Sequence, residues 1–291
     1  MARSFILLVA SMWRPSLDDE DKMFSIDLRG KTALITGGTR GIGLGIGEAF
    51  ASAGATVILT YRWGGADLDQ IKDSFVSRGF PAPRFEMADV SHREDTEALM
   101  GRIKEDCDGV DLFVNNVAFA GRPATLKEYR KRSLYKSLDY SAWPLVEYLE
   151  VMEATFGRYP GHVVAISSDG MDRSYPGYDF VAISKSVLEV MTRYLGSHLK
   201  SEGTKVNAIR FGMVATESFE SMFGAEIWEF LRLEGIEKED LMTPEECGKA
   251  VLALCSGLLD GMQSEVVTVD KAMAFEDNLM RRYQRWQSTK E

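Results

Sequence analysis

The chain has 291 residues, of which 34 are basic and 44 acidic, so its formal net charge at pH 7 is −10. Its hydrophobic fraction of 45% and charged fraction of 27% are ordinary for a globular protein and exclude a disordered chain or a membrane channel. The acidic balance argues against nucleic acid as a partner, and the scattered histidines argue against a metal site. Cys107, Cys247 and Cys255 cannot form a disulfide framework, so we expect a reducing, cytoplasmic setting.

Residues 1–27 precede the regularly patterned part of the chain. They contain one short apolar run, from Phe5 to Ala10, which is too short to span a membrane. We interpret residues 1–27 as an N-terminal extension and expect no membrane association. A weak signal peptide is the alternative, although no small-x-small cleavage site comes after the run.

From Lys31 onward, short apolar runs alternate with segments long enough for helices. Continuous apolar runs are typical of strands that are buried on both faces of a sheet. We predict strands at 32–36, 56–61, 84–90, 111–116, 162–167, 205–211 and 265–270. Strands joined by helices form a parallel sheet with helices on both faces, so the sequence predicts one doubly wound α/β domain of about seven strands over residues 28–271. Residues 272–291 then form a C-terminal tail.

Three longer segments stand out between the strands. We expect long helices over 124–157 and 178–202. Residues 215–242 form an apolar-rich insert after the sixth predicted strand. Because ligands bind beyond the carboxyl ends of strands in such sheets, this insert is either a substrate lid or an ordinary helical layer packed on the core.

A glycine-rich turn comes after the first predicted strand. Its sequence, I-T-G-G-T-R-G-I-G, places Gly37, Gly41 and Gly43 in a G-x-x-x-G-x-G pattern that opens a helix. Glycine permits the tight turn and lets a pyrophosphate approach the backbone, and the helix N-terminus offers free N–H groups. The turn therefore predicts a dinucleotide-binding site, to which Thr39 and Ile42 of the same turn contribute.

The end of the second predicted strand indicates the cofactor. An NAD-selective site carries an acidic residue there to hold the adenosine ribose, but this chain has Tyr61, followed by Arg62. Arg40 in the glycine turn is a second nearby cation. Two guanidinium groups suit a 2′-phosphate, so we predict NADPH. The alternative is that Arg40 and Arg62 are solvated surface charges.

At this point the sequence resembles the short-chain dehydrogenase/reductase family, over about residues 28–271. The T-G-x-x-x-G-x-G turn matches, and "NNVAFAG" at 115–121 is similar to the family's N-N-A-G segment. The segment "VNAIRFGMVAT" at 206–216 is similar to the family's V-N-x-x-x-P-G-x-x-x-T, with Phe211 at the usual proline. The resemblance implies a Rossmann fold and further cofactor contacts from Asp89, Val90, Asn116, Val117, Lys185, Gly212, Val214 and Thr216.

The spacing of the expected catalytic residues departs from the commonest family pattern. Four residues before Lys185 stands Val181, which has no proton to give, and seven residues before it stands Tyr178. This Tyr-x6-Lys spacing resembles bacterial enoyl-acyl-carrier-protein reductases, most closely their third, NADPH-dependent class. That class also shares the serine-containing "ISS" strand, which ends at Ser168. Tyr140 stands where the family usually has an asparagine.

The resemblance implies reduction of the carbon–carbon double bond of an enoyl thioester. Tyr178 would donate a hydrogen bond to the thioester oxygen, Lys185 would hold the nicotinamide ribose, and Ser168 could donate a second bond. A tyrosine one helical turn farther from the lysine suits this substrate, because its oxygen lies two bonds beyond the carbon that takes hydride. Two alternatives are a ketoreductase in a specialised polyketide or lipid pathway and a non-catalytic NADPH-binding relative.

The segment 127–136 concentrates positive charge in an otherwise acidic chain. A basic patch beside the active site would attract an acidic acyl carrier protein and speed encounter, although a solvated helix face is the simpler interpretation. The cations are Lys127, Arg130, Lys131, Arg132 and Lys136. The resemblance also implies a homodimer or homotetramer, formed through the helices expected at 124–157 and 178–202.

Overall fold

The structure is a computed structural model that describes residues 26–123, 125–276 and 287. Its centre is a seven-stranded parallel sheet in the order β3-β2-β1-β4-β5-β6-β7. The strands are β1 (Thr32–Ile35), β2 (Thr56–Tyr61), β3 (Arg84–Met87), β4 (Leu112–Asn115), β5 (His162–Ser168), β6 (Lys205–Phe211) and β7 (Val266–Val269). The prediction of a doubly wound α/β sheet of about seven strands is confirmed.

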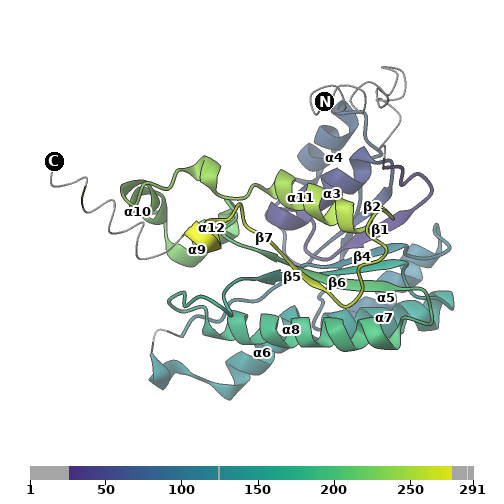
Figure 1. Cartoon of the computed structure of the whole chain (residues 1–291). Coiled ribbons are helices and arrows are strands. Elements are labelled where there is room, and N and C mark those ends of the chain that lie inside the picture. The colour runs from purple at the N-terminus through teal and green to yellow at the C-terminus, as the bar shows by residue number, and fades with distance from the viewer. Residues whose placement is uncertain (1–25, 124, 277–286, 288–291) are drawn as a thin grey trace, which may run out of the picture.

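Helices cover both faces of the sheet (Figure 1). One face carries α3 (Gly41–Ser52), α4 (Leu68–Ser77) and α11 (Pro244–Leu254), and the other carries α5 (Arg93–Lys104), α6 (Lys131–Ser141), α7 (Pro144–Phe156) and α8 (Asp179–His198). Successive residues of β1 serve the two faces in turn, because side chains alternate along a strand. Ala33 and Ile35 belong to the core around Phe50, whereas Leu34 belongs to the core around Tyr148.

The prediction of one long helix over 124–157 is wrong. Position 124 lies outside the described residues, and the chain beyond it forms a short 3₁₀ turn, η1 (Leu126–Glu128), and then α6 and α7 as separate helices. The break comes at Pro144, which is the first residue of α7. Proline has no N–H to continue the hydrogen-bond ladder of α6, so the chain turns there and restarts. The helix expected at 178–202 is α8, which begins one residue later and ends at His198.

The segment 215–242 forms a small helical layer beyond the carboxyl end of β6. It contains α9 (Glu217–Phe223), α10 (Ile227–Leu233) and η2 (Lys238–Asp240), and α12 (Met273–Glu276) lies beside them (Figure 1). Phe219, Leu231 and Leu241 form a core of its own, separate from the two cores of the sheet. The helical layer is therefore stabilised by its own core, and its first helix, α9, faces the carboxyl end of the sheet.

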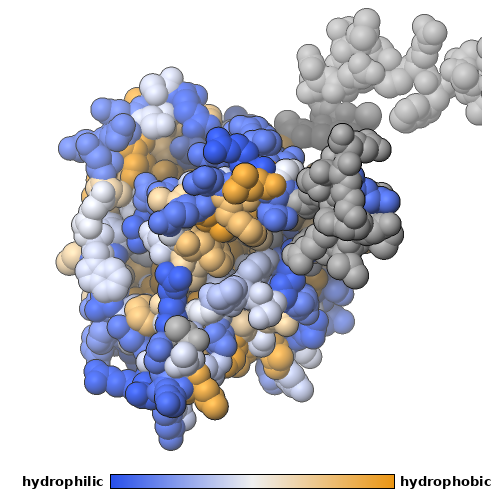
Figure 2. Space-filling model, turned by 90° about the vertical axis from the view of Figure 1, so that its left-hand side faces the viewer, coloured by the Kyte–Doolittle hydropathy of each residue, from blue (hydrophilic) through white to orange (hydrophobic). Residues whose placement is uncertain are grey.

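Two predicted segments fall mostly outside the described residues, namely the extension at 1–27 and the tail at 272–291. Among the residues that are described, no helix is both long and apolar enough to cross a bilayer. Hydrophobic side chains nevertheless gather amid polar ones on the face of the molecule that carries α9, α10 and α12 (Figure 2).

Candidate active site

Three adjoining pockets lie at the carboxyl ends of the strands. The outer pocket, of about 570 Å³, lies between the glycine turn and the ends of β2 and β3. The central pocket, of about 550 Å³, lies between the glycine turn, the end of β5 and the start of α8 and α9. The apolar pocket, of about 160 Å³, lies between the ends of β5 and β6 and α9. Shared residues join them into one continuous site.

The glycine turn forms the wall between the outer and central pockets. Gly37 and Gly41 have φ of 63° and 51°, which favour glycine, and a β-carbon on Gly43 would lie 2.4 Å from the carbonyl oxygen of Gly37. The Nδ2 amide of Asn116 donates to the carbonyl oxygens of Thr36 at 2.8 Å and of Gly37 at 3.2 Å. Asn116, predicted as a cofactor contact, therefore also holds the turn in shape.

The turn leads directly into the N-terminus of α3. Arg40 occupies the N-cap position with extended backbone, and its side chain makes no capping hydrogen bond. The first N–H groups of this twelve-residue helix are thus directed at the pockets without a side-chain acceptor. Backbone in this arrangement fits a pyrophosphate, so the residues present suit a dinucleotide cofactor.

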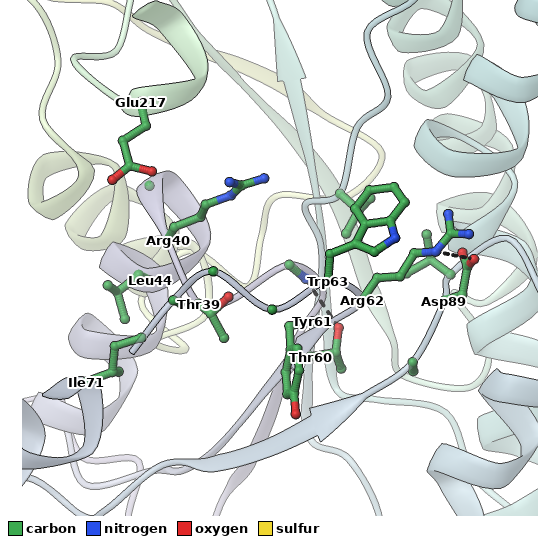
Figure 3. A pocket seen from close by; sticks show the side chains of 18 of the residues that line it. Thr39, Arg40, Leu44, Thr60, Tyr61, Arg62, Trp63, Ile71, Asp89 and Glu217 are labelled. Carbon is green, nitrogen blue, oxygen red and sulfur yellow. Dashed lines mark hydrogen bonds and ion pairs between the residues drawn. The ribbon is translucent and has the colours of Figure 1, made fainter. Parts of the chain in front are cut away.

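The two predicted arginines of the outer pocket differ in their ion pairing. The Arg62 Nε lies 2.7 Å from the Asp89 carboxylate, and the guanidinium stacks 4.3 Å over the ring of Trp63 (Figure 3). Arg40 is exposed and, within the described residues, makes no ion pair. Tyr140 also donates to Asp89, at 3.2 Å, so this tyrosine serves the outer pocket. Arg40 is therefore the cation with its charge available.

The central pocket brings the three predicted catalytic side chains together. The Tyr178 hydroxyl donates to the Ser168 Oγ at 3.0 Å, and the Lys185 Nζ donates to the Ile166 carbonyl oxygen at 2.6 Å. Tyr178 is the N-cap residue of α8, whose first helical bond runs from the Ala182 N–H to the Tyr178 carbonyl oxygen. The helix start thus positions the tyrosine, and the end of β5 positions the serine.

Burial changes the acidity of two of these groups. Burial lowers the pKa of Lys185 from 10.5 to about 8, partly offset by the nearby carboxylate of Glu189. Burial also raises the pKa of Tyr178, which the hydrogen bond to Ser168 partly counters. At neutral pH Tyr178 is a proton-bearing donor and Lys185 is predominantly a cation, 4% exposed.

The two adjacent serines at the end of β5 have different roles. The Ser167 hydroxyl donates to Glu189 at 2.7 Å, so its proton is committed to a buried carboxylate. The Arg210 guanidinium donates two hydrogen bonds of 2.6 Å to the same Glu189 carboxylate. Ser168 is the serine that bonds Tyr178, and its oxygen also accepts from the Gly170 N–H at 3.2 Å.

Every residue predicted for the site lines one of the three pockets. The outer pocket has Gly37, Thr39, Arg40, Gly41, Tyr61, Arg62, Asp89, Val90 and Val117. The central pocket has Gly37, Arg40, Gly41, Ile42, Gly43, Asn116, Val117, Ser168, Tyr178, Lys185 and Thr216, and the apolar pocket has Gly212 and Val214. The Thr216 hydroxyl accepts from the Phe219 N–H at 3.1 Å and caps α9, so its oxygen is partly committed there.

Sequence reasoning missed several residues of the site. Trp63 stacks on Arg62, Gly170 lies against Tyr178, and Asp169 accepts a hydrogen bond from Tyr175 beside the apolar pocket. All stand in loops after strands, where no periodic pattern marks them. Position in a loop at the carboxyl edge of the sheet is the one signal that could have identified them.

The five predicted basic residues are exposed: Lys127 lies on η1, Arg130 is the N-cap residue of α6, and Lys131, Arg132 and Lys136 lie in its first two turns. Tyr129, between them, hydrogen-bonds Asp179 and packs its ring 5.1 Å from that of Phe180, which ties the segment to the start of α8. Within the described part of the chain, no three His, Cys, Asp or Glu side chains converge as metal ligands.

Comparisons with known proteins agree with this geometry. The family model described as "Enoyl-(Acyl carrier protein) reductase" matches residues 37–273. An NADH-dependent enoyl-[acyl-carrier-protein] reductase FabI of Aquifex aeolicus is 29% identical over 84% of this chain and 91% of its own. A 3-oxoacyl-[acyl-carrier-protein] reductase FabG of Chlamydia muridarum is 27% identical over 84% of this chain and 97% of its own.

Solved structures show the same fold. A short-chain dehydrogenase of Burkholderia cenocepacia, solved in complex with NADP, superposes with a TM-score of 0.71 at 23% identity, over 84% of this chain and 98% of that one. The resemblance noted from the glycine turn and the catalytic spacing is confirmed by the family match. The chain is a member of the short-chain dehydrogenase/reductase family of oxidoreductases, in the group that resembles enoyl-acyl-carrier-protein reductases.

Proposed function

We propose that this oxidoreductase uses NADPH to reduce the carbon–carbon double bond of an enoyl thioester. The observation that supports this best is the Tyr178–Ser168 hydroxyl pair beside Lys185 in the central pocket. Val181 lines the same pocket four residues before the lysine but carries no proton. Among the described residues that line this pocket, the donor at helical spacing from Lys185 is therefore Tyr178, at the spacing that resembles enoyl reductases.

The residues of the central pocket suit the charge that such a reaction develops. NADPH, when bound, supplies a hydride, here to the β-carbon of the thioester. Negative charge then develops on the thioester oxygen, and the Tyr178 hydroxyl donates to that oxygen. The resulting enolate takes a proton from water at its α-carbon, which completes the saturated product.

Ser168 is poised to be a second donor. A hydroxyl has one proton and two lone pairs. The Ser168 oxygen accepts from Tyr178 and from the Gly170 N–H, which leaves its own proton available to the pocket. When Tyr178 exchanges Ser168 for the substrate oxygen, Ser168 can follow with a second hydrogen bond.

Lys185 would hold the nicotinamide ribose hydroxyls, with the glycine turn and α3 holding the pyrophosphate. Its ammonium has three protons, and one is directed at the Ile166 carbonyl oxygen. Two remain for ribose oxygens on the pocket side. The cation also favours negative charge near Tyr178.

The preference for NADPH over NADH is part of the proposal. Arg40 has its charge available in the outer pocket, and Tyr61 stands where a selective carboxylate would. Arg62 is already paired with Asp89, so it contributes less to a 2′-phosphate than the sequence alone implies. The FabI relatives are NADH enzymes by name, which makes cofactor preference an essential measurement.

A ketoreductase is the second candidate, since the FabG relative matches almost as well as FabI. NADPH oxidation with crotonyl and acetoacetyl thioesters, measured side by side, separates the two. The enoyl proposal predicts turnover of the crotonyl thioester, with saturated butyryl thioester as product. Turnover of the acetoacetyl thioester alone would make the chain a ketoreductase. Cofactor binding without turnover of either would make it a non-catalytic relative.

We further propose that an acidic acyl carrier protein docks on the basic segment at 127–136. Lys131 and Arg132 are the first two residues of α6, which has no acidic residue in its first turn. Cations at a helix N-terminus are unfavourable because they oppose the helix dipole. Their presence there, exposed and next to the start of α8, is better explained by a partner's charge than by stability of the helix.

We also propose that the chain forms a homodimer or homotetramer through α8 and its neighbours. Ile183, Val190 and Tyr194 lie on one side of α8, at spacings of seven and four residues, and are 39%, 51% and 67% exposed. An exposed apolar row on a long helix is typical of a protein contact. Sedimentation or light scattering, with Val190→Glu as the disrupting variant, tests this assembly.

A further inference from the structure

The apolar pocket is the natural place for the acyl chain of a substrate. It shares Ser168 and Tyr178 with the central pocket, so a thioester whose oxygen meets Tyr178 can extend its chain into it. Most of its other walls are apolar, which suits a hydrocarbon. They include Ile42, Phe211, Met213, Phe219, Met222 and Phe223.

One residue, Tyr175, is shared by the linings of this pocket and of a larger surface groove. The lining of the side groove, of about 770 Å³, comes from two segments: Arg122, Pro123, Thr125, Leu126 and Tyr129, and the loop residues 174–177 and 179. Tyr175 lines both the side groove and the apolar pocket, and it does not line the central pocket. Its ring therefore stands as the partition between them.

Tyr175 is fixed at its hydroxyl and at its ring. The hydroxyl donates to the Asp169 Oδ2 at 2.9 Å, and Asp169 is only 7% exposed. Arg173 supports the same carboxylate, with its Nε 3.7 Å away. The Tyr175 ring packs edge-on against Tyr178 at 5.7 Å and against Phe223 of α9 at 6.1 Å. A ring held in this way acts as a rigid wall.

We infer that Tyr175 closes the acyl pocket and limits the acyl chain that the enzyme accepts. The pocket volume of about 160 Å³ is close to the ~150 Å³ of a protein cavity that holds a benzene molecule. About six carbons of the acyl chain therefore fit in this pocket beyond the reacting carbons, and a chain that extends farther meets the Tyr175 ring. This inference rests on the proposed enoyl-thioester function, and it adds a limit on the length of the substrate's acyl chain.

The kinetic test compares 2-hexenoyl-CoA with 2-dodecenoyl-CoA. The wild-type chain is expected to favour the hexenoyl substrate in kcat/KM by at least about tenfold, the scale on which a pocket discriminates chain length. Tyr175→Ala joins the pocket to the side groove and should remove most of that preference. Tyr175→Phe keeps the ring and loses only the bond to Asp169, so it should retain the preference. Tyr175→Leu, which removes part of the ring, serves if the alanine variant does not fold.

Equal loss of activity on both substrates in Tyr175→Ala would overturn the inference, because Tyr175 would then merely support Tyr178. So would a wild-type chain that reduces both substrates equally well. A binding readout separates this from failure of the proposed function. With NADP⁺ present, wild-type protein should bind hexanoyl-CoA more tightly than dodecanoyl-CoA. Tyr175→Ala should lose most of this difference in Kd, even if no enoyl thioester is reduced. Dissociation constants that are the same in the wild type and in Tyr175→Ala would contradict the inference that the Tyr175 ring limits the acyl chain.

Discussion

A β-carbon on Gly170 would lie 2.4 Å from Cε1 of the Tyr178 ring, closer than two carbon atoms can approach without a shift. The same residue donates its N–H to the Ser168 oxygen at 3.2 Å. Gly170 therefore sets the position of both hydroxyls in the central pocket, although it has no side chain to take part in chemistry.

Gly170→Ala should lower kcat by about 100-fold, because a displacement of about 1 Å in a reacting group has an effect of that size. Steady-state kinetics with a crotonyl thioester measure it. Gly101→Ala on α5 is the matched control, since its β-carbon would meet nothing within 4 Å. A Gly170→Ala variant with wild-type kcat would show that the tyrosine does not need this position.

The lowered pKa of Lys185 predicts a loss of activity at alkaline pH. The ammonium loses its proton as pH rises through about 8, so kcat/KM should fall above that pH with a limiting slope of one. Lys185→Arg keeps its charge over this range and should lose the alkaline limb, even if its plateau is lower. An unchanged pH profile in Lys185→Arg would assign the limb to another group.

The same pKa predicts the opposite trend in stability. Between about pH 8 and the unfolded value of 10.5, the unfolded chain holds the Lys185 proton and the folded chain does not. The free energy of unfolding should therefore rise with pH in this window from this group, by at most about 1.4 kcal/mol per pH unit. Denaturant unfolding of the wild type and of Lys185→Met, compared over the window, isolates the contribution. A rise of equal size in both would exclude Lys185 as its source.

Arg40→Ala should reduce the preference for NADPH over NADH. A charge-assisted hydrogen bond is worth about 1.5–3 kcal/mol, so the ratio of kcat/KM values should fall by about 10- to 150-fold with NADH activity retained. Arg62→Ala should have a smaller effect, because Asp89 already neutralises that cation. Arg93→Ala, an exposed arginine on α5, is the control. An unchanged ratio in Arg40→Ala would refute its part in cofactor choice.

Substitutions in the basic segment at 127–136 should increase the stability of α6 and weaken the binding of a carrier-bound substrate. The double variant Lys131→Glu/Arg132→Glu should stabilise α6 slightly, because acidic residues suit a helix N-terminus. It should raise KM for a carrier-bound enoyl substrate severalfold while leaving an N-acetylcysteamine thioester unaffected. Lys72→Glu on α4 is the matched exposed control. Equal effects on both substrates would place the change at the active site instead of a docking surface.

Much of this fold could be predicted because its inner strands, such as β1 and β4, are buried on both faces and are therefore continuous apolar runs. The strands at 56–61 and 205–211 have the predicted bounds. Strand β3 ends at Met87, three residues before the predicted end, because the chain leaves the sheet to bring Asp89 into the outer pocket. The break between α6 and α7 coincides with Pro144 in the sequence. A proline inside a helix costs more free energy than the helix-forming residues around it contribute.

The contacts that tune the site could not be predicted from the chain alone. The pairing of Arg62 with Asp89 joins the loops that follow β2 and β3, which α4 separates in the chain. The bond from Tyr175 to Asp169 depends on the path of a loop that no periodic pattern describes. Residue types and spacing indicated which groups gather at the sheet edge, and tertiary structure decided which of them are already neutralised.

The most direct test of the account is the effect of Tyr178→Phe on reduction of a crotonyl thioester with NADPH. Removing a hydrogen-bond donor to a developing oxyanion should lower kcat by about 100-fold or more while the Kd of NADPH stays unchanged. Tyr135→Phe, which loses a hydroxyl on an exposed tyrosine outside the three pockets, should change kcat little on the same substrate. A Tyr178→Phe variant with nearly wild-type kcat would contradict the central claim that this tyrosine stabilises the thioester oxygen.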